Sequence, residues 1–207
     1  MDINIRVNPY AKNLSAIILA GGYSKRMKQF KPLLPLGDST IIENTINVFR
    51  NSGVDDITVV IGYRANDVKV VLDCMDVKWV YNQNYHEGMY SSVVAGVSSL
   101  PASINGFFLL PADMPFVKKE TIEELLRVYN STTYDIIYPT YKGHRGHPPL
   151  ISERLFPAIK NWDGSGGLRA LLSKYQEVST QVEVTDENIL TDMDTHEDYL
   201  KFKVICG

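Results

Sequence analysis

Short apolar runs and amphipathic segments alternate along this chain from Leu14 onward. The apolar runs are short and free of charge, as in strands buried on both faces, whereas the amphipathic segments have the i, i+3, i+4 spacing of helices. The runs predict strands at residues 16–20, 57–61, 77–81, 106–110, 134–138 and 178–184, the last of them at a sheet edge or antiparallel. The other segments predict helices at residues 40–51, 66–72, 90–100, from 121, at 152–160, at 165–175 and after 195. The alternation predicts an α/β fold with a mostly parallel sheet.

Three of the predicted helices begin at capping sequences. Residues 40–43 and 121–124 both start with Thr and end with Glu, and Thr195 stands three residues before Asp198. In such a pair the Thr hydroxyl accepts from the backbone N–H of the acidic residue, whose carboxylate accepts from the Thr N–H. The sequence therefore predicts that these helices start at the three Thr residues.

Length, charge and cysteine content narrow the class of protein. The chain has 207 residues, 44% of them hydrophobic, which predicts one globular domain at residues 14–207 after an extension at residues 1–13. The formal net charge of −3 argues against a nucleic-acid partner. Because no apolar stretch approaches the roughly 20 residues of a membrane span and the start lacks signal-peptide character, we expect a cytoplasmic protein with no membrane association. The two cysteines form no C-x-x-C pair and predict neither a disulfide framework nor a zinc site.

The first predicted strand ends at a glycine pair that is followed by cations. Gly21 and Gly22 allow backbone N–H groups to approach an anion closely. Four cations then follow with no acid among them, although the whole chain is acidic: Lys25, Arg26, Lys28 and Lys31. The pattern predicts a phosphate-binding loop, although a glycine pair followed by a few lysines is more often a tight turn with a solvated basic face. Neither the P-loop pattern G-x-x-x-x-G-K-[ST] nor the dinucleotide pattern G-x-G-x-x-G is present.

Carboxylates at two places in the chain could hold a metal ion. Asp113 follows the predicted strand 106–110 and would lie at the same sheet edge as the glycine pair, where open α/β sheets bind ligands. Asp192 and Asp194 are two residues apart and would project from one face of an extended segment. On spacing alone, a turn or capping role is the simpler explanation for all three. The alternative is that one of the pair joins Asp113 to hold Mg²⁺, which takes one or two carboxylates plus substrate phosphates.

The residues from Leu19 to Leu36 closely resemble a known nucleotidyltransferase signature. They read Leu-Ala-Gly-Gly-x-Ser-x-Arg-Met, with Lys31 four residues further on and then Leu-Leu-Pro-Leu. The resemblance is to the enzymes that act on sugar phosphates and on the molybdenum cofactor. Residues 111–115, Pro-Ala-Asp-Met-Pro, are similar to the metal-aspartate motif of that family, and residues 192–198 to its closing motif. Two positions depart from the family pattern, with Lys28 in place of Gly and His196 in place of Pro.

The resemblance implies a three-layer α/β/α, Rossmann-like nucleotidyltransferase fold with a mostly parallel, mixed sheet. It gives catalytic roles to Arg26 and Lys31. It gives the metal ion, Mg²⁺, to Asp113 and Asp194, with Asp192 as the other candidate for the second ligand. It also implies a set of nucleotide-binding residues: Leu19, Ala20, Gly21, Gly22, Ser24, Lys25, Asn82, Gly88, Met89 and Ser92.

Residues 143–148, Gly-His-Arg-Gly-His-Pro, resemble the Gly-His-Pro segment of the molybdenum cofactor cytidylyltransferases. The resemblance places four residues beside the acceptor substrate: His144, Arg145, His147 and Pro148. A zinc site at the two histidines is the weaker interpretation, because structural zinc sites normally have four ligands.

The implied reaction joins the nucleotidyl group of a nucleoside triphosphate, with CTP favoured, to the phosphate of molybdopterin and releases pyrophosphate. The alternatives are a guanylyltransferase of the molybdenum cofactor and a sugar-1-phosphate nucleotidyltransferase. An alternative of another class is a non-catalytic carrier of a nucleotide or cofactor. The expected partners are the triphosphate and a molybdopterin-type acceptor, with a molybdoenzyme as a candidate protein partner.

Overall fold

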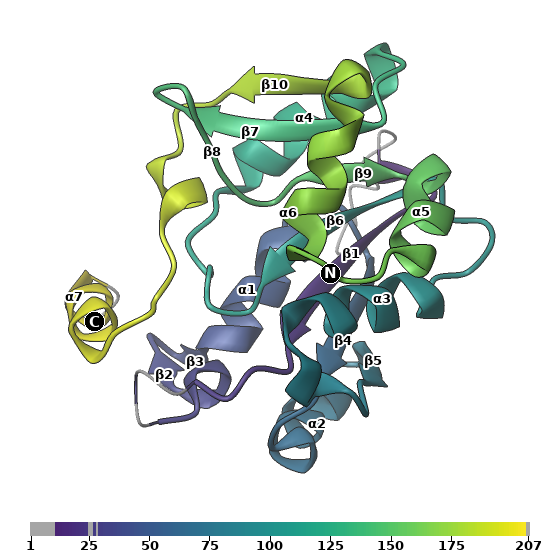
Figure 1. The fold of residues 1–207 in the computed structure, drawn as a ribbon. Helices are drawn as coiled ribbons and strands as arrows, with labels where there is room; N and C mark the ends of the chain where they lie inside the picture. Colours follow the sequence, from purple (N-terminus) through teal and green to yellow (C-terminus); the bar gives the residue numbers. More distant parts are fainter. Residues whose placement is uncertain (1–10, 25–26, 28, 206–207) are drawn as a thin grey trace, which may run out of the picture.

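A computed structural model gives the fold for residues 11–24, 27 and 29–205. At its centre is a sheet with the strand order β10-β7-β9-β6-β1-β4-β5, and β8 pairs with β7 off this path (Figure 1). The strands of this sheet are β1 (Leu14–Ala20), β4 (Asp56–Ile61), β5 (Lys78–Tyr81), β6 (Gly106–Pro111), β7 (Ile136–Tyr141), β8 (His144–Arg145), β9 (Leu150–Ser152) and β10 (Ser179–Glu183). Only the pairs made by β8 and β9 are antiparallel among the described strands of this sheet, which is therefore mixed and mostly parallel, as predicted. A separate hairpin joins β2 (Pro35–Leu36) to β3 (Ser39–Thr40).

Helices cover both faces of the sheet. The α-helices are α1 (Ile41–Arg50), α2 (Ala65–Cys74), α3 (Met89–Ser99), α4 (Lys119–Ser131), α5 (Phe156–Asn161), α6 (Gly167–Leu172) and α7 (His196–Ile205). Short 3₁₀ helices are η3 (Lys31–Leu33), η4 (Tyr85–Glu87), η5 (Glu153–Leu155), η6 (Ser173–Val178) and η7 (Glu187–Leu190). No helix within the described part of the chain has the length and apolar character needed to cross a membrane.

Two apolar clusters on opposite faces of β1 make the structure three-layered. All seven residues of β1 are buried, and successive side chains of a strand point to opposite faces. Ile18 therefore belongs to the cluster that contains Phe49 of α1 and residues of α2 and α4. Ile17 belongs to the cluster that contains Val93 of α3 and residues of α5 and α6. The predicted α/β/α architecture is confirmed.

The alternation of apolar runs and amphipathic segments predicted the positions of the longer strands and helices well. All six predicted strands are present, with ends that differ by three residues or fewer, and each predicted helical segment contains a helix. The last strand, β10, lies at the sheet edge, as predicted, but it runs parallel to β7, so the antiparallel alternative is wrong. Strands β2, β3, β8 and β9 were not predicted, because two or three residues are too few to show a periodicity.

Two of the three capping predictions are confirmed and one is wrong. Thr40 and Glu43 form the capping box of α1, and Thr195 and Asp198 exchange the same pair of bonds at the start of α7. Helix α4 begins two residues earlier than predicted, so Thr121 lies inside its first turn. The hydroxyl of Thr121 donates to Asp186 Oδ2 at 3.0 Å, and Lys118 N donates to the same oxygen at 2.8 Å.

The carboxylate of Asp186 therefore caps α4 from outside the helix, and its loss is expected to destabilise the protein. Asp186 is 2% exposed and also accepts from Asn188 N and Nδ2 at 3.1 and 2.9 Å. Asp186→Ala would leave several donors unsatisfied, so we expect a loss of about 2–4 kcal/mol in the free energy of unfolding. Urea denaturation measures this loss. Glu187→Ala removes the exposed neighbouring carboxylate as a control, and an equal effect of both variants would show that Asp186 has no special role.

The order of the strands places a binding crevice beside β1. The chain leaves β1 for β4 and β5 on one side and then returns to β6 on the other side, so both neighbours of β1 are parallel to it. Loops on the two sides of such a switch point diverge at the carboxyl ends of the strands and leave a crevice there. The loops after β1 and β6 carry Gly21, Gly22 and Asp113 into this crevice.

Candidate active site

A cleft with a volume of about 530 Å³ lies at the carboxyl ends of β1 and β6. The residues that line it come from the loop after β1, from η3, from the segment leading into α3, from the end of β6 and from the segment before α7. Of the residues predicted from the sequence, the cleft is lined by Leu19, Ala20, Gly21, Gly22, Ser24, Lys31, Gly88, Met89, Ser92, Asp113 and Asp194. Segments far apart in sequence therefore meet in one cavity.

The ammonium of Lys31 lies between two carboxylates. Its Nζ donates to Asp113 Oδ2 at 3.0 Å and to Asp194 Oδ1 at 2.8 Å. The side chain of Lys31 is 9% exposed, and the two aspartate side chains are 22% and 31% exposed. A buried cation needs such partners, because its desolvation is otherwise very costly. These three residues form the charged end of the cleft.

Asp113 is held by backbone and side-chain contacts on both sides. Ala112 N donates to Leu19 O at 3.0 Å, which continues the pairing of β6 with β1 into the loop. The hydroxyl of Thr45 on α1 donates to Ala112 O at 2.9 Å. The carbonyl of Asp113 accepts from Met193 N at 3.1 Å, so this loop and the segment before α7 are joined directly.

Packing of Met193 brings Asp194 to the cleft. Met193 is fully buried in a cluster with Met27, Ile41 and Tyr199, and the Tyr199 hydroxyl donates to Pro35 O at 2.8 Å. Figure 1 shows α7 beside the β2–β3 hairpin, at the side of the molecule. The neighbouring residue Asp192 is exposed. Of the two candidates for the second metal ligand, the structure brings Asp194 against Lys31 and Asp113.

The glycine turn after β1 lies close to α3. Gly21 O accepts from Tyr63 N at 3.2 Å, and a Cβ atom at Gly21 would lie 3.2 Å from Ser92 Oγ. Ser24 has a φ of 51°, and its Oγ accepts from Lys31 N at 3.2 Å, which ties the turn to the start of η3. The predicted residues Lys25 and Arg26 lie outside the described residues, so their roles stay predictions.

Asn82 lies behind the wall of the cleft and is not among the residues that line it, so its nucleotide-binding role stays a prediction. It is 5% exposed, and its Nδ2 donates to Ser91 Oγ at 2.8 Å and to Ser92 Oγ at 2.9 Å. Its Oδ1 accepts from Asn84 N at 2.9 Å. Gly88 has a φ of 107°, a conformation that favours glycine, immediately before α3. The amide of Asn82 therefore holds the start of α3, from which Ser92 reaches the cleft.

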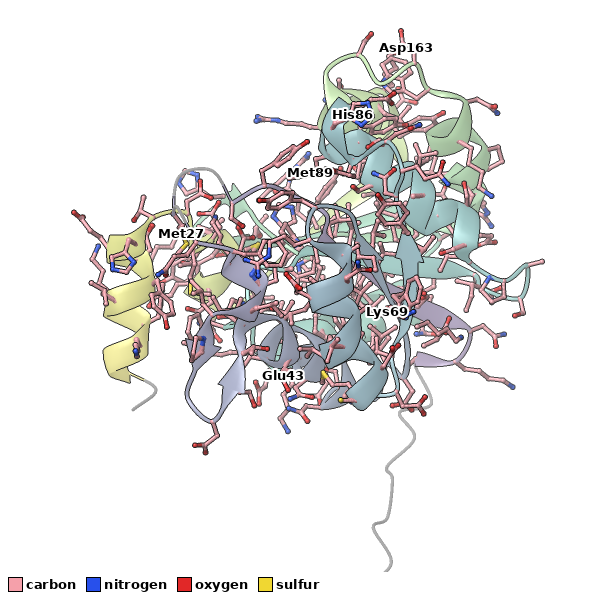
Figure 2. The ribbon with its side chains drawn as sticks, turned by 90° about the horizontal axis from the view of Figure 1, so that it is seen from below. Met27, Glu43, Lys69, His86, Met89 and Asp163 are labelled. Atoms are coloured by element: carbon pink, nitrogen blue, oxygen red, sulfur yellow. The ribbon has the colours of Figure 1, made fainter. Side chains whose placement is uncertain are left out.

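Aromatic residues that the sequence did not single out also line the cleft. Tyr23, Tyr85 and His86 are among its lining residues, and the Tyr23 ring lies 5.5 Å from Tyr85 and 5.0 Å from Tyr63, centroid to centroid. Figure 2 labels His86, which precedes α3, and Met89, the first residue of α3. Tyr23 occupies an unspecified position of the sequence signature, so that signature could not point to it. These residues form the aromatic end of the cleft.

The four predicted acceptor residues are divided between two places. His144 and Arg145 are exposed on β8, outside the lining of the cleft, with the Arg145 guanidinium 4.6 Å from the centre of the Tyr138 ring. His147 N donates to Ile189 O at 2.8 Å, and burial lowers the pKa of the His147 imidazole, while the charges of Asp113 and Asp192 partly oppose this shift. None of the four residues is among those that line the cleft, but the imidazole of His147 is close enough to Asp113 to be influenced by its charge.

The two carboxylates fit a magnesium ion that also binds phosphate. The described residues contain no cluster of three or more His, Cys, Asp or Glu that could hold a metal by itself. Mg²⁺ is commonly bound by one or two carboxylates, with substrate phosphates and water completing six oxygen ligands. Asp113 and Asp194 supply two carboxylates on the same side of a cleft large enough for a nucleotide. The donor set therefore suits Mg²⁺ delivered with a polyphosphate.

Comparisons with known proteins identify the family to which this chain belongs. The family model described as MobA-like NTP transferase domain matches residues 16–178. The molybdenum cofactor cytidylyltransferase of Escherichia coli is 30% identical over 193 residues, which are 92% of this chain and 95% of that protein. The nicotine blue oxidoreductase of Paenarthrobacter nicotinovorans is 26% identical over 89% of this chain and 93% of its own.

A solved structure has the same fold over nearly the whole chain. The crystal structure of Rv0371c from Mycobacterium tuberculosis superposes with a TM-score of 0.81 at 25% identity, covering 92% of this chain and 97% of that chain. A second crystal structure of that protein, with a TM-score of 0.77, is a complex with manganese.

Proposed function

Because the chain belongs to the MobA-like NTP transferase family and is a nucleotidyltransferase, we propose that it transfers the cytidylyl group of CTP to the phosphate of molybdopterin. Pyrophosphate is the second product, and Mg²⁺ is the metal ion. The relative with 30% identity over 92% of the chain, a molybdenum cofactor cytidylyltransferase, supports this choice of nucleotide and acceptor. Family membership alone does not identify the nucleotide or the acceptor, because one fold can serve several substrates.

The convergence of Lys31, Asp113 and Asp194 is the observation that carries the proposal. Their contacts of 3.0 and 2.8 Å join three segments of the chain beside a glycine turn. Phosphoryl transfer needs charge neutralisation and alignment far more than it needs covalent chemistry from the protein. A cleft with a buried lysine and two carboxylates, at the switch point of a mostly parallel sheet, suits both needs.

The acceptor needs no general base from the protein. A phosphate monoester has a second pKa near ~6 and is already largely ionised at neutral pH. The acceptor phosphate oxygen attacks the α-phosphorus of the triphosphate, and the bond to the pyrophosphate oxygen breaks on the opposite side. Lys31, with Arg26 as predicted, stabilises the charge that develops on the phosphate oxygens. Asp113 and Asp194 would hold the Mg²⁺ ion, which would supply further neutralisation of the phosphate charge.

The residues in and around the cleft suggest where each part of the substrates would bind. The aromatic end, with Tyr23 and Tyr85, suits a planar base, while the charged end suits the triphosphate. His147, which is influenced by the charge of Asp113, suits the acceptor side together with the adjacent Pro148. The exposed position of His144 and Arg145 on β8 supports contact with the outer part of a large acceptor.

A comparison of triphosphates tests this function. We expect the full chain with Mg²⁺ and molybdopterin to release pyrophosphate faster from CTP than from GTP, UTP or ATP, and mass spectrometry to find the cytidylyl product. Faster release with GTP would instead identify a guanylyltransferase. Turnover with a sugar 1-phosphate but not with molybdopterin would identify a sugar-phosphate enzyme. Nucleotide or cofactor binding with no pyrophosphate from any triphosphate would identify a carrier and refute the proposed activity.

A further inference from the structure

The Lys31 ammonium contacts both of the carboxylates that the proposed function gives to the metal ion. It lies 3.0 Å from Asp113 Oδ2 and 2.8 Å from Asp194 Oδ1, which places it in the space between the two side chains. An ammonium and a metal ion compete for the same oxygen lone pairs. While Lys31 makes both contacts, a cation that enters between the aspartates must displace it or bind beside a like charge, and either event has a cost in free energy.

We propose that Lys31 is a built-in counter-ion of the metal site, so that the site accepts a divalent cation efficiently only together with a polyphosphate. This inference rests on the proposed function. The ammonium offsets one carboxylate charge of this pair, which weakens the attraction of the pair for a free divalent cation. A triphosphate changes the balance, because its oxygens offer the displaced ammonium a new anionic partner at the same end of the cleft.

The movement that this exchange needs is confined to a side chain. Lys31 N donates to Ser24 Oγ at 3.2 Å, Lys31 O accepts from Leu34 N at 3.0 Å, and Pro32 follows directly, so the backbone of Lys31 is anchored. The four-carbon stem of a lysine can redirect its ammonium by rotation about its own bonds. Lys31 can therefore leave the carboxylates for the phosphates without any rearrangement of the cleft.

Binding of Mn²⁺ alone tests the inference without any turnover. The free Mn²⁺ signal in electron paramagnetic resonance is titrated with the full chain, with Lys31→Met and with Lys119→Met. Methionine keeps an unbranched stem and removes the charge, and Lys119 is an exposed lysine on α4 that serves as the matched control. Without nucleotide, we expect Lys31→Met to bind Mn²⁺ about tenfold more tightly than the wild type, and Lys119→Met to equal the wild type.

A second variant and a nucleotide analogue separate the possible failures. If Lys31→Met does not fold, Lys31→Gln replaces it, since the amide still donates a hydrogen bond but carries no charge. Equal or weaker Mn²⁺ binding by the uncharged variant refutes the inference. If the wild type together with a CTP analogue that has a methylene bridge between the α- and β-phosphorus atoms then binds more Mn²⁺ than the analogue alone, the proposed metal site stands. If neither the analogue complex nor the variant binds Mn²⁺, both the inference and the metal assignment are refuted.

Discussion

Lys31→Met is expected to slow pyrophosphate release by at least about a hundredfold, because one preorganised charge in such a site is worth roughly 3 kcal/mol in the transition state. Lys31 is the buried cation at the charged end of the cleft, and methionine fills similar space without its charge. The lost stabilisation belongs to charge that develops during transfer, so the decrease should appear mainly in kcat and less in KM. Steady-state release of pyrophosphate from CTP with molybdopterin measures both constants.

The matched control for this prediction is Lys119→Met, an equal loss of charge on the exposed surface of α4. It should leave kcat unchanged. Full activity of Lys31→Met would contradict both the catalytic assignment and the mechanism built on it. The same substitution is expected to tighten the binding of free Mn²⁺, so it should weaken catalysis and strengthen metal binding. A variant that was simply misfolded would lose both properties together.

The sequence was sufficient to bring Gly21 and Asp113 together. Each follows a buried apolar run, and two such runs in an alternating α/β chain pair in parallel with their carboxyl ends at one edge. The structure pairs β1 directly with β6, and both loops line one cleft. Such a placement follows from topology alone and needs no knowledge of side-chain packing.

The position of Asp194 could not be predicted from local pattern. It lies 163 residues from Lys31 along the chain, in a segment outside the described strands and helices. Its location depends on the burial of Met193 and on the bond from Met193 N to Asp113 O, which are tertiary contacts. The capping error at Thr121 has the same cause, since the distant carboxylate of Asp186 satisfies the first turn of α4.

On the nucleotide side of the cleft, the sequence did not identify all of the residues that line the cavity. The family resemblance gave a nucleotide-binding role to Asn82 and none to Tyr85, because a resemblance assigns roles by residue type and not by position in space. In the structure Asn82 bonds to Ser91 and Ser92, whereas Tyr85 lines the cavity. A Cβ atom at Gly62 would lie only 2.6 Å from the Cβ of Tyr85, so this glycine makes room for the aromatic residue. A contact of that kind becomes visible only when two loops are placed in space.

The second large effect is expected from Asp194→Asn, which should lower kcat by about a hundredfold or more at a fixed Mg²⁺ concentration. An amide keeps the size of the side chain but removes the negative charge that the metal ion and Lys31 both need. Asp194 contacts Lys31 at 2.8 Å, so the loss also leaves that ammonium with Asp113 as its remaining carboxylate partner in the described part of the chain. The measurement is pyrophosphate release as a function of Mg²⁺ concentration, in which the half-saturating Mg²⁺ concentration should rise.

Asp192→Asn is the matched control, because it makes the same chemical change two residues away on an exposed carboxylate. If Asp194 is the second metal ligand, Asp192→Asn should retain nearly full kcat and an unchanged Mg²⁺ requirement. The opposite pattern, in which Asp192→Asn is inactive and Asp194→Asn is not, would transfer the role to Asp192 and contradict the geometry around Lys31. Near-normal activity of both variants would mean that this segment does not bind the catalytic metal, and Asp113 would then be the one carboxylate left to hold it in the described cleft.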